Sequence, residues 1–185
     1  MTAATEPSGA GIDPRAFRNA LGSFATGVCV VTAVTGDGTR LGMTVNSFSS
    51  VSLDPPLVLF SVANAAKGLE AWLGVEHYAI NMLAWNQQDV SNRFARPMTD
   101  KWAGLEVDTG VHGVPLIRGA LARFECSGEH QYPGGDHVIM VGRVLNFEVL
   151  RPDAEPLVFH RGRYRELTHE HDITVPADAM WLLGW

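Results

Sequence analysis

The stretch Leu41–Val62, LGMTVNSFSSVSLDPPLVLFSV, combines β-branched apolar residues with seven hydroxyl and amide side chains. Asp54 is its only ionisable residue, and Pro55-Pro56 divides it into two strand-like runs. A sheet surface that faces water normally carries charged residues, and a protein core is normally apolar. The stretch is typical of neither, so we expect it to face something other than water or core.

The rest of the chain also has the pattern of short strands separated by turns. Two β-branched runs flank Gly36-Asp37-Gly38, whose residues tolerate positive φ, and this pattern predicts a β-hairpin. Further strands are predicted over residues 57–62, 77–83, 119–132 and 137–150, and short helices over residues 64–74 and 86–95. Residues 156–167 are predicted to form a short strand, a turn and another strand. This spacing favours a mainly β fold, an antiparallel barrel with a few short helices, over alternating βαβ units.

A further helix is predicted near the N-terminus. Asp13 is a good N-cap, and Pro14 suits the first helical position. The apolar stripe that follows consists of Phe17, Ala20, Leu21 and Phe24. Thr26-Gly27 is predicted to end this helix.

Composition and charge exclude several classes of protein. The 185 residues carry a formal net charge of −6, which argues against a nucleic-acid partner and against an anionic membrane surface. The apolar runs are too short for a transmembrane helix, and the N-terminus does not resemble a signal peptide, so we expect a cytoplasmic protein. Residues 1–12 are interpreted as a flexible leader to one domain, residues 13–185.

The sequence indicates neither a metal site nor a redox centre. Cys29 and Cys126 lie far apart with no C-x-x-C motif, and Cys29 is predicted to be a small buried hydrophobe. His169–Asp172, HEHD, is interpreted as a solvated surface turn. The motifs G-x-G-x-x-G, G-x-x-x-x-G-K-[ST], G-x-S-x-G and H-E-x-x-H are absent. The strongest functional signal therefore remains Leu41–Val62.

The side chains of this stretch suit a flat heterocycle. In a continuous strand, Thr44, Asn46 and Phe48 point one way, while Val45 and Ser47 point the other. Backbone groups at a strand end, aided by Asn and Ser side chains, can hydrogen-bond a ring edge that has donors and acceptors.

Two cations downstream suit a phosphate. Lys67 lies near the start of a predicted short helix, where free N–H groups and a cation favour an anion. Arg93, near the end of NQQDVSNRF, is a candidate second cation. A flat polar-edged ring with a phosphate at its far end describes a flavin nucleotide. The residues alone also allow a polar sheet face whose hydroxyls find partners within the protein.

Five blocks of the chain, taken together, resemble the short-chain flavin reductases that serve two-component flavin monooxygenases. The blocks are FRNALGSFATGVCVVTA (17–33), GMTVNSFSSVSLDPPLVLFSV (42–62), AINMLAWNQQDVSNRFA (79–95), GGDHVIMVGRV (134–144) and PLVFHRGRYREL (156–167). They occur in the family's order, and the similarity spans residues 13–167. The resemblance implies a flavin-binding, Greek-key split β-barrel, usually a homodimer. It also implies that FAD or FMN is reduced with NADH or NADPH for a partner monooxygenase.

The resemblance further implies which residues contact the flavin. The ring contacts fall on Thr44, Val45, Asn46, Ser47 and Phe48, followed by Ser50 and Val51. The phosphate-side loop falls on Ala65, Ala66 and Lys67, with Arg93 across from it. Family members often have Ser or Thr beside this cation, whereas Ala65 and Ala66 offer only backbone N–H groups.

The NAD(P)H region implied by the resemblance has two parts. It comprises His137 of GGDH and the run His160, Arg161, Gly162, Arg163 and Tyr164. Guanidiniums around a glycine suit a pyrophosphate, and Tyr164 is available to pack on a ring. Hydride transfer needs little acid–base help from a protein, so we expect no essential catalytic residue and give His137 a role in placing the nicotinamide. Alternatively, His137 caps a hairpin and RGRYR is a solvated basic turn.

Three other functions remain open at this point. A flavin- or haem-binding split barrel without reductase activity is the main alternative, although it would not need the histidine and arginine motifs. A pyridoxamine-phosphate oxidase-type enzyme would need more clustered basic residues. A structural dimerisation domain would leave the polar strand unexplained. The tryptophans at positions 72, 85, 102, 181 and 185 are predicted to anchor the core or a dimer interface.

Overall fold

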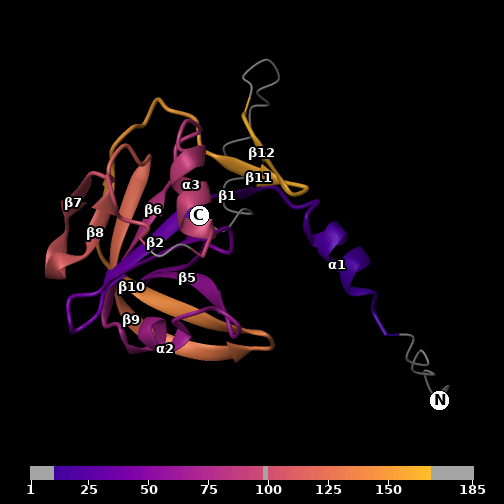
Figure 1. Ribbon diagram of the computed structural model, residues 1–185, viewed down its shortest axis with the longest axis horizontal. Helices are drawn as coiled ribbons and strands as arrows, with labels where there is room; N and C mark the ends of the chain where they lie inside the picture. The colour runs from indigo at the N-terminus through magenta and orange to yellow at the C-terminus, as the bar shows by residue number, and fades with distance from the viewer. Residues whose placement is uncertain (1–10, 98–99, 168–185) are drawn as a thin grey trace.

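The computed structural model describes residues 11–97 and 100–167. Its main sheet has seven antiparallel strands in the order β3-β2-β6-β9-β10-β5-β4 (Figure 1). These strands are β2 (Cys29–Val34), β3 (Arg40–Val45), β4 (Ser49–Leu53), β5 (Pro56–Ala63), β6 (His77–Met82), β9 (Ala122–Gly134) and β10 (His137–Val149). The predicted mainly β, antiparallel architecture is confirmed.

Two smaller sheets flank the main one. The first contains β1 (Thr26–Gly27), β11 (Val158–His160) and β12 (Arg163–Arg165), and the second contains β7 (Val107–Thr109) and β8 (Pro115–Ile117). The sequence predicted the β11–β12 hairpin but missed β7 and β8, which are only three residues each. Strands this short give too few residues for alternation to be recognised.

The main core lies on the inner face of the curled seven-stranded sheet. In β5, Val58, Phe60 and Val62 are buried in strict alternation, and they pack with Tyr78 and Ile80 from β6. β9 and β10 pair with register shifts at Val141/Gly142 and at Val144/Asn146. Bulges of this kind increase strand twist and let one long ribbon bend around a core.

The described residues form three α-helices beside the sheets: α1 (Pro14–Leu21), α2 (Leu69–Gly74) and α3 (Gln88–Ala95). They also form a 3-10 turn, η1, over Val111–Gly113. The N-cap of α1 is confirmed, since the Asp13 carboxylate accepts a hydrogen bond from the Arg15 backbone N–H. The predicted end of this helix is wrong, because α1 stops at Leu21 and Thr26-Gly27 instead pairs with β11.

α3 is fastened directly to β3. The Thr44 hydroxyl donates a 2.6 Å hydrogen bond to the Ser91 carbonyl, and the ring of Phe94 lies over Gly42. A Cβ at position 42 would come within 2.3 Å of the Phe94 ring, so only glycine allows this approach.

One expectation about Leu41–Val62 is wrong. β3 ends at Val45, and residues 46–48 form a connection to β4 rather than a continuation of the strand. The alternation expected along Thr44–Phe48 therefore stops at Val45, because the chain must turn before it pairs with β5 from Ser49 onward.

Other expectations have mixed outcomes. Cys29 is a buried free thiol, as predicted, and burial raises its pKa to about 12. No helix among the described residues is long and apolar enough to span a membrane. The predicted leader up to residue 10, the HEHD segment, Trp181 and Trp185 lie outside the described residues.

Candidate active site

A pocket of about 650 Å³ opens where β3 ends, and this volume is within the usual range for small-molecule sites. It gathers segments far apart in the sequence: the end of β3, the 46–48 connection, the end of β5, the end of α3 and the β9–β10 turn. Six predicted ligand contacts line it together: Thr44, Val45, Asn46, Ser47, Ala66 and His137.

The polar side chains of the pocket are partly fixed by hydrogen bonds. The Ser61 backbone N–H donates to the Ser47 hydroxyl oxygen at 3.0 Å, and the proton of the Thr44 hydroxyl goes to α3. Asn46 is exposed, and its side chain has no hydrogen bond to any described residue. Asn46 and Ser47 therefore present donors and acceptors at the rim of a pocket that is lined mainly by small and apolar residues.

The opposite wall is the β9–β10 turn, which is held against β5 by Asn64. The Asn64 backbone N–H donates to the Asp136 carbonyl at 2.8 Å, and its side-chain amide donates to the Gly135 carbonyl at 3.0 Å. Gly135 has a φ of 74°, a backbone conformation that suits glycine. The turn is thus a fixed wall rather than a loose loop.

This turn orients the imidazole of His137. Its Nδ1 lies 2.7 Å from Asp136 Oδ1, and 43% of the side chain is exposed. The hydrogen bond from His137, supported by the charge of the imidazole, holds the pKa of Asp136 below its usual value. The carboxylate fixes the ring orientation and leaves Nε2 for another partner.

The pocket lining is almost free of charge. Apart from His137, its lining residues are apolar, small or uncharged polar side chains. Such a lining suits a flat neutral ring with polar edges, as expected from Leu41–Val62. Because no Lys or Arg among the described residues lines the pocket, the phosphate of a bound nucleotide would lie outside it.

The predicted phosphate cations lie outside this lining. Lys67 is exposed, two residues before α2. Arg93 is held by the following loop, where its guanidinium donates to the Ala103 carbonyl at 2.7 Å. The expected role of Ala66 is also weakened, because its backbone N–H already donates to the Ala63 carbonyl at 2.9 Å.

A second pocket of about 620 Å³ shares Asn46 with the first. Arg161 and Gly162 line it from the β11–β12 turn, and Arg18 lines it from α1. Arg161 and Gly162 have φ values of 50° and 74°, as in the type I′ turns of two-residue hairpins. Part of the predicted NAD(P)H region thus lies beside the first pocket, with two guanidiniums in reach of an anion.

The rest of the HRGRY run does not line either pocket. Tyr164 is a core residue: its hydroxyl lies 2.8 Å from Ser91 Oγ and donates to Asn92 Oδ1 at 3.2 Å, and its ring packs on Phe159. It is therefore not placed to pack on a nicotinamide. His160 is half-buried, and Arg163 is exposed on β12.

Four of the predicted flavin contacts also lie away from the first pocket. Phe48 turns inward and packs against Phe124, with ring centroids 6.0 Å apart. Ser50 and Val51 are exposed on β4, and Ala65 is exposed in the turn before α2. The strand end at Val45 explains this separation, because the chain changes direction before Phe48.

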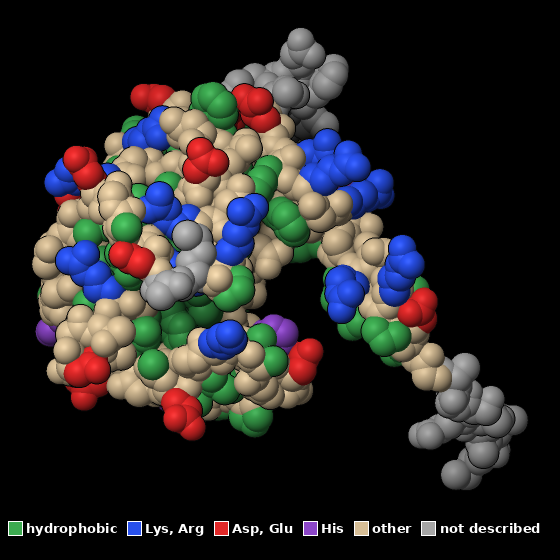
Figure 2. Space-filling view, in the orientation of Figure 1, with side chains coloured by type: hydrophobic (Ala, Val, Ile, Leu, Met, Phe, Trp, Pro, Cys, Tyr) green, Lys and Arg blue, Asp and Glu red, His purple; other side chains and the backbone are tan. Residues whose placement is uncertain are grey.

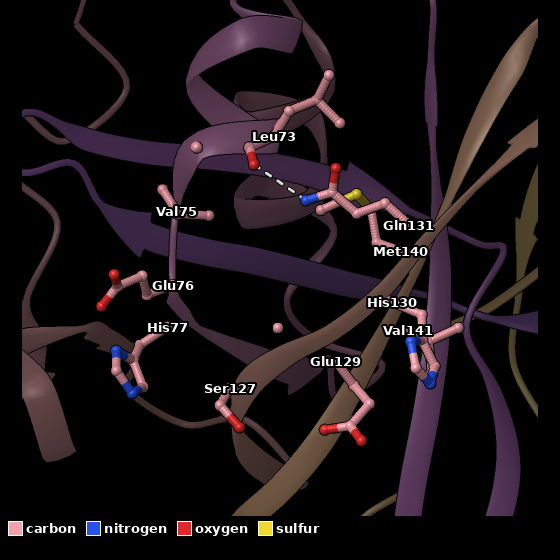
Figure 3. Close-up of a pocket in the computed structure, with 12 residues that line it drawn as sticks. Leu73, Val75, Glu76, His77, Ser127, Glu129, His130, Gln131, Met140 and Val141 are labelled. Atoms are coloured by element: carbon pink, nitrogen blue, oxygen red, sulfur yellow. Dashed lines mark hydrogen bonds between the residues drawn. The ribbon is translucent and has the colours of Figure 1, made fainter.

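Another cavity, of about 710 Å³, lies elsewhere, between the α2–β6 connection and β9 (Figure 3). Glu76 and Glu129 point apart in this view, and no Lys or Arg is among the described residues that line it. The pKa of Glu129 is lowered by its hydrogen bonds to Arg143. An acidic lining disfavours a phosphate, so we do not place the nucleotide here.

Three residues of the site were not predicted from the sequence: Ser61, Ala63 and Asp136. Ser61 supplies the N–H that holds Ser47, Ala63 lines the pocket, and Asp136 orients His137. The alternation of β5 could have indicated the first two, since they share the face opposite to Phe60 and Val62.

Comparison with known proteins agrees with this geometry. Residues 21–168 match the flavin reductase like domain family. The FMN reductase (NADH) SmoA of Agrobacterium fabrum is 45% identical over 160 residues, covering 86% of this chain and 90% of that protein. The NADH:FAD oxidoreductase SgcE6 of Streptomyces globisporus C-1027, solved with NAD and FAD fragments, superposes with a TM-score of 0.80 at 36% identity, covering 89% of this chain and all of that chain.

Other relatives are subunits of larger systems or longer chains. The reductase subunit HsaB of a flavin-dependent monooxygenase from Rhodococcus jostii is 40% identical over 169 residues, covering 90% of this chain and 83% of that protein. The chain spans only 44% of a probable flavin reductase from Rhizobium meliloti, to which it is 48% identical over 136 residues, or 74% of its own length. The split-barrel fold and the resemblance deduced from the sequence are confirmed, and the chain belongs to the flavin reductase like domain family.

Proposed function

We propose that this protein is an NAD(P)H:flavin oxidoreductase that reduces FAD or FMN and supplies the reduced flavin to a partner monooxygenase. The observation that carries the proposal is the uncharged pocket between Asn46 and the Asp136–His137 pair. Its volume, its polar rim and its near absence of charge fit an isoalloxazine ring. The family membership and the names of the relatives support the same activity.

Hydride transfer between nicotinamide and flavin is chemistry that the two cofactors supply when they are bound. The chain has to bind both rings, align them and exclude water. Asn46 and Ser47 would hydrogen-bond the polar ring edge, and His137 would place the nicotinamide from the facing wall. Arg161 would hold a phosphate group in the second pocket.

The homodimer and the oxygenase partner belong to this proposal. The relatives named as reductase subunits of monooxygenases support a partner oxygenase. A cytoplasmic location belongs to the same proposal, since the reaction draws on the NAD(P)H of the cell.

A steady-state assay that crosses FAD and FMN with NADH and NADPH tests the proposal. We expect oxidation of at least one nicotinamide that depends on added flavin. Binding of flavin without any oxidation of NADH or NADPH would instead favour the non-catalytic flavin-binding module.

A further inference from the structure

The helix α1 buries none of its residues within its own chain. It is nevertheless amphipathic: Phe17 is 53% exposed, Leu21 is 59% exposed, and Phe24 just beyond the helix is 77% exposed. Figure 1 shows α1 as an arm that projects away from the sheets, and Figure 2 shows its apolar side chains next to those of basic residues.

The base of this arm is fixed. The Arg161 backbone N–H donates to the Gly22 carbonyl at 2.8 Å, which ties the end of α1 to the β11–β12 turn. Helices of eight residues are marginal in water, so their stability comes mostly from packing of an apolar face. The apolar face of α1 therefore requires a surface that its own described residues do not provide.

Exposed apolar side chains also occur on the main sheet, on β4 and on the part of β10 beyond its pairing with β5. We call them the β4/β10 patch; its residues are Val51, Leu53, Leu145, Phe147 and Val149. Phe147 is 65% exposed and Leu53 is 73% exposed. Phe147 pairs in register with Phe124 on β9, and their rings stack with centroids 6.2 Å apart.

The patch continues the face of the sheet that carries the core. Phe124 packs against the main core and also against Phe48, so the rings of Phe48, Phe124 and Phe147 form a row that leads outward. At the inner end of this row, Phe48, Met82 and Leu121 help to line a small, mostly apolar pocket of about 100 Å³. The patch thus continues the apolar face of the sheet that carries the core, but no described residue covers it. The small apolar pocket lies beside it.

Charge is also complementary between the two surfaces. Arg18 borders the apolar stripe of α1. Asp54 follows Leu53 at the edge of the patch. Such pairs at an interface rim favour one register and steer association.

We propose that two copies of this chain exchange their N-terminal arms. The stripe of Phe17, Leu21 and Phe24 from each copy packs on the β4/β10 patch of the other. This inference rests on the homodimer in the proposed function and names the surfaces that form it. The two contacts are equivalent, as required of an isologous interface with two-fold symmetry.

The surfaces are large enough for a stable dimer. A fully covered aromatic ring buries about 150–250 Å². Phe17, Phe24 and Phe147 take part in each contact and are 53%, 77% and 65% exposed. Each contact occurs twice, so covering these rings would bury roughly 600–1,000 Å², about half of the ~1,200–2,000 Å² in a specific interface. The aliphatic residues of both surfaces add to this area.

Charge-introducing substitutions on each surface test the proposal. Leu21→Glu alters the arm, and Phe147→Glu and, independently, Leu53→Glu alter the patch. Asn19→Glu is the matched control, because it adds the same charge on the opposite side of α1. All four positions are exposed, so each variant is expected to keep the circular dichroism spectrum of the wild type.

Sedimentation should show a dimer for the wild type and for Asn19→Glu at micromolar concentration. The arm variant and both patch variants should weaken dimerisation by about 30-fold or more, as expected for central anchors of an interface. A monomeric wild type, or dimers that all three of these substitutions leave unchanged, would overturn the proposal.

Mixing the variants distinguishes arm exchange from a dimer in which patch meets patch. A heterodimer of Leu21→Glu and Phe147→Glu keeps one intact arm–patch contact, whereas each homodimer keeps none. We therefore expect the mixture to dimerise more strongly than either variant alone. If the mixture stays as monomeric as its components, arm exchange is wrong. Flavin-dependent NADH oxidation by the wild type, measured separately, decides the proposed function independently of this result.

Discussion

Replacement of Gly42 by alanine should disturb the site through the packing of α3. The new Cβ would lie 2.3 Å from Cε1 and 2.6 Å from Cδ1 of Phe94, far inside van der Waals contact. Phe94 is 1% exposed and packs edge-on against Trp102, so its ring has no free space to retreat into. The substitution must therefore push α3 away from β3.

Overpacking of this kind typically costs about 1–3 kcal/mol, which for a chain of this size lowers Tm by roughly 3–10 °C. The same displacement strains the Thr44–Ser91 hydrogen bond and moves Ala95 in the pocket lining. We expect Gly42→Ala to lower both Tm in a calorimetric scan and flavin affinity in a fluorescence titration.

A double-mutant cycle tests the reason for this loss. Phe94→Leu shortens the side chain that clashes, so Gly42→Ala combined with Phe94→Leu should be more stable than the sum of the single effects predicts. Gly36→Ala is the matched control, because no atom lies within 4 Å of its added Cβ. If the stability effects of Gly42→Ala and Phe94→Leu are strictly additive, or if Gly36→Ala loses as much stability as Gly42→Ala, the clash with Phe94 is not the cause of the loss.

Three further predictions concern the ligands and acid stability. Asn46→Ala should weaken flavin binding by about 1–3 kcal/mol, because the polar edge of the flavin ring is then buried without its hydrogen-bond partner. Quenching of flavin fluorescence measures this affinity. His137→Ala and Arg161→Ala should raise the KM for NAD(P)H with little change in flavin affinity. The effect of Arg161→Ala on KM should be larger at low salt, because it is electrostatic. Arg163 is exposed and lines neither pocket, so Arg163→Ala should raise KM less. Arg143 lowers the pKa of Glu129 in the folded state. The pair therefore stabilises the fold when the pH is above the ordinary carboxyl pKa. This stabilisation is lost as the pH falls through the lowered pKa of Glu129. On acidification the Tm of Arg143→Met should therefore fall less than the Tm of the wild type. If Tm depends on pH in the same way in both proteins, this prediction is wrong.

Much of the fold could be predicted because local pattern and tertiary packing agree. The hairpin at Gly36-Asp37-Gly38 and the long β9–β10 ribbon follow directly from β-branched runs around turn residues. The cap at Asp13 similarly specified where α1 begins. The end of β3 was not predictable from local pattern, since Asn46-Ser47-Phe48 continues the alternation and only pairing with β5 turns the chain.

The site was only partly accessible from the sequence for the same reason. Thr44–Ser47 and His137 could be predicted because the residues that carry the resemblance are the residues that line the pocket. Tyr164 looked free in HRGRY, but its partners Ser91 and Asn92 are about seventy positions away and no local signal reveals them. The exposed face of α1 looked like an ordinary core-facing stripe, because periodicity does not say which chain provides the core.

The central claim is that the pocket between Asn46 and His137 holds flavin where NAD(P)H can reduce it. The most direct test is an anaerobic titration of the protein and one equivalent of flavin with NADH and, separately, with NADPH, following the absorbance of oxidised flavin and of the nicotinamide together. For at least one nicotinamide we expect both absorbances to fall in equal proportion, and we expect Asn46→Ala to require more flavin to reach the same rate. Flavin that binds in this pocket but stays oxidised in the presence of excess NADH and of excess NADPH would contradict it.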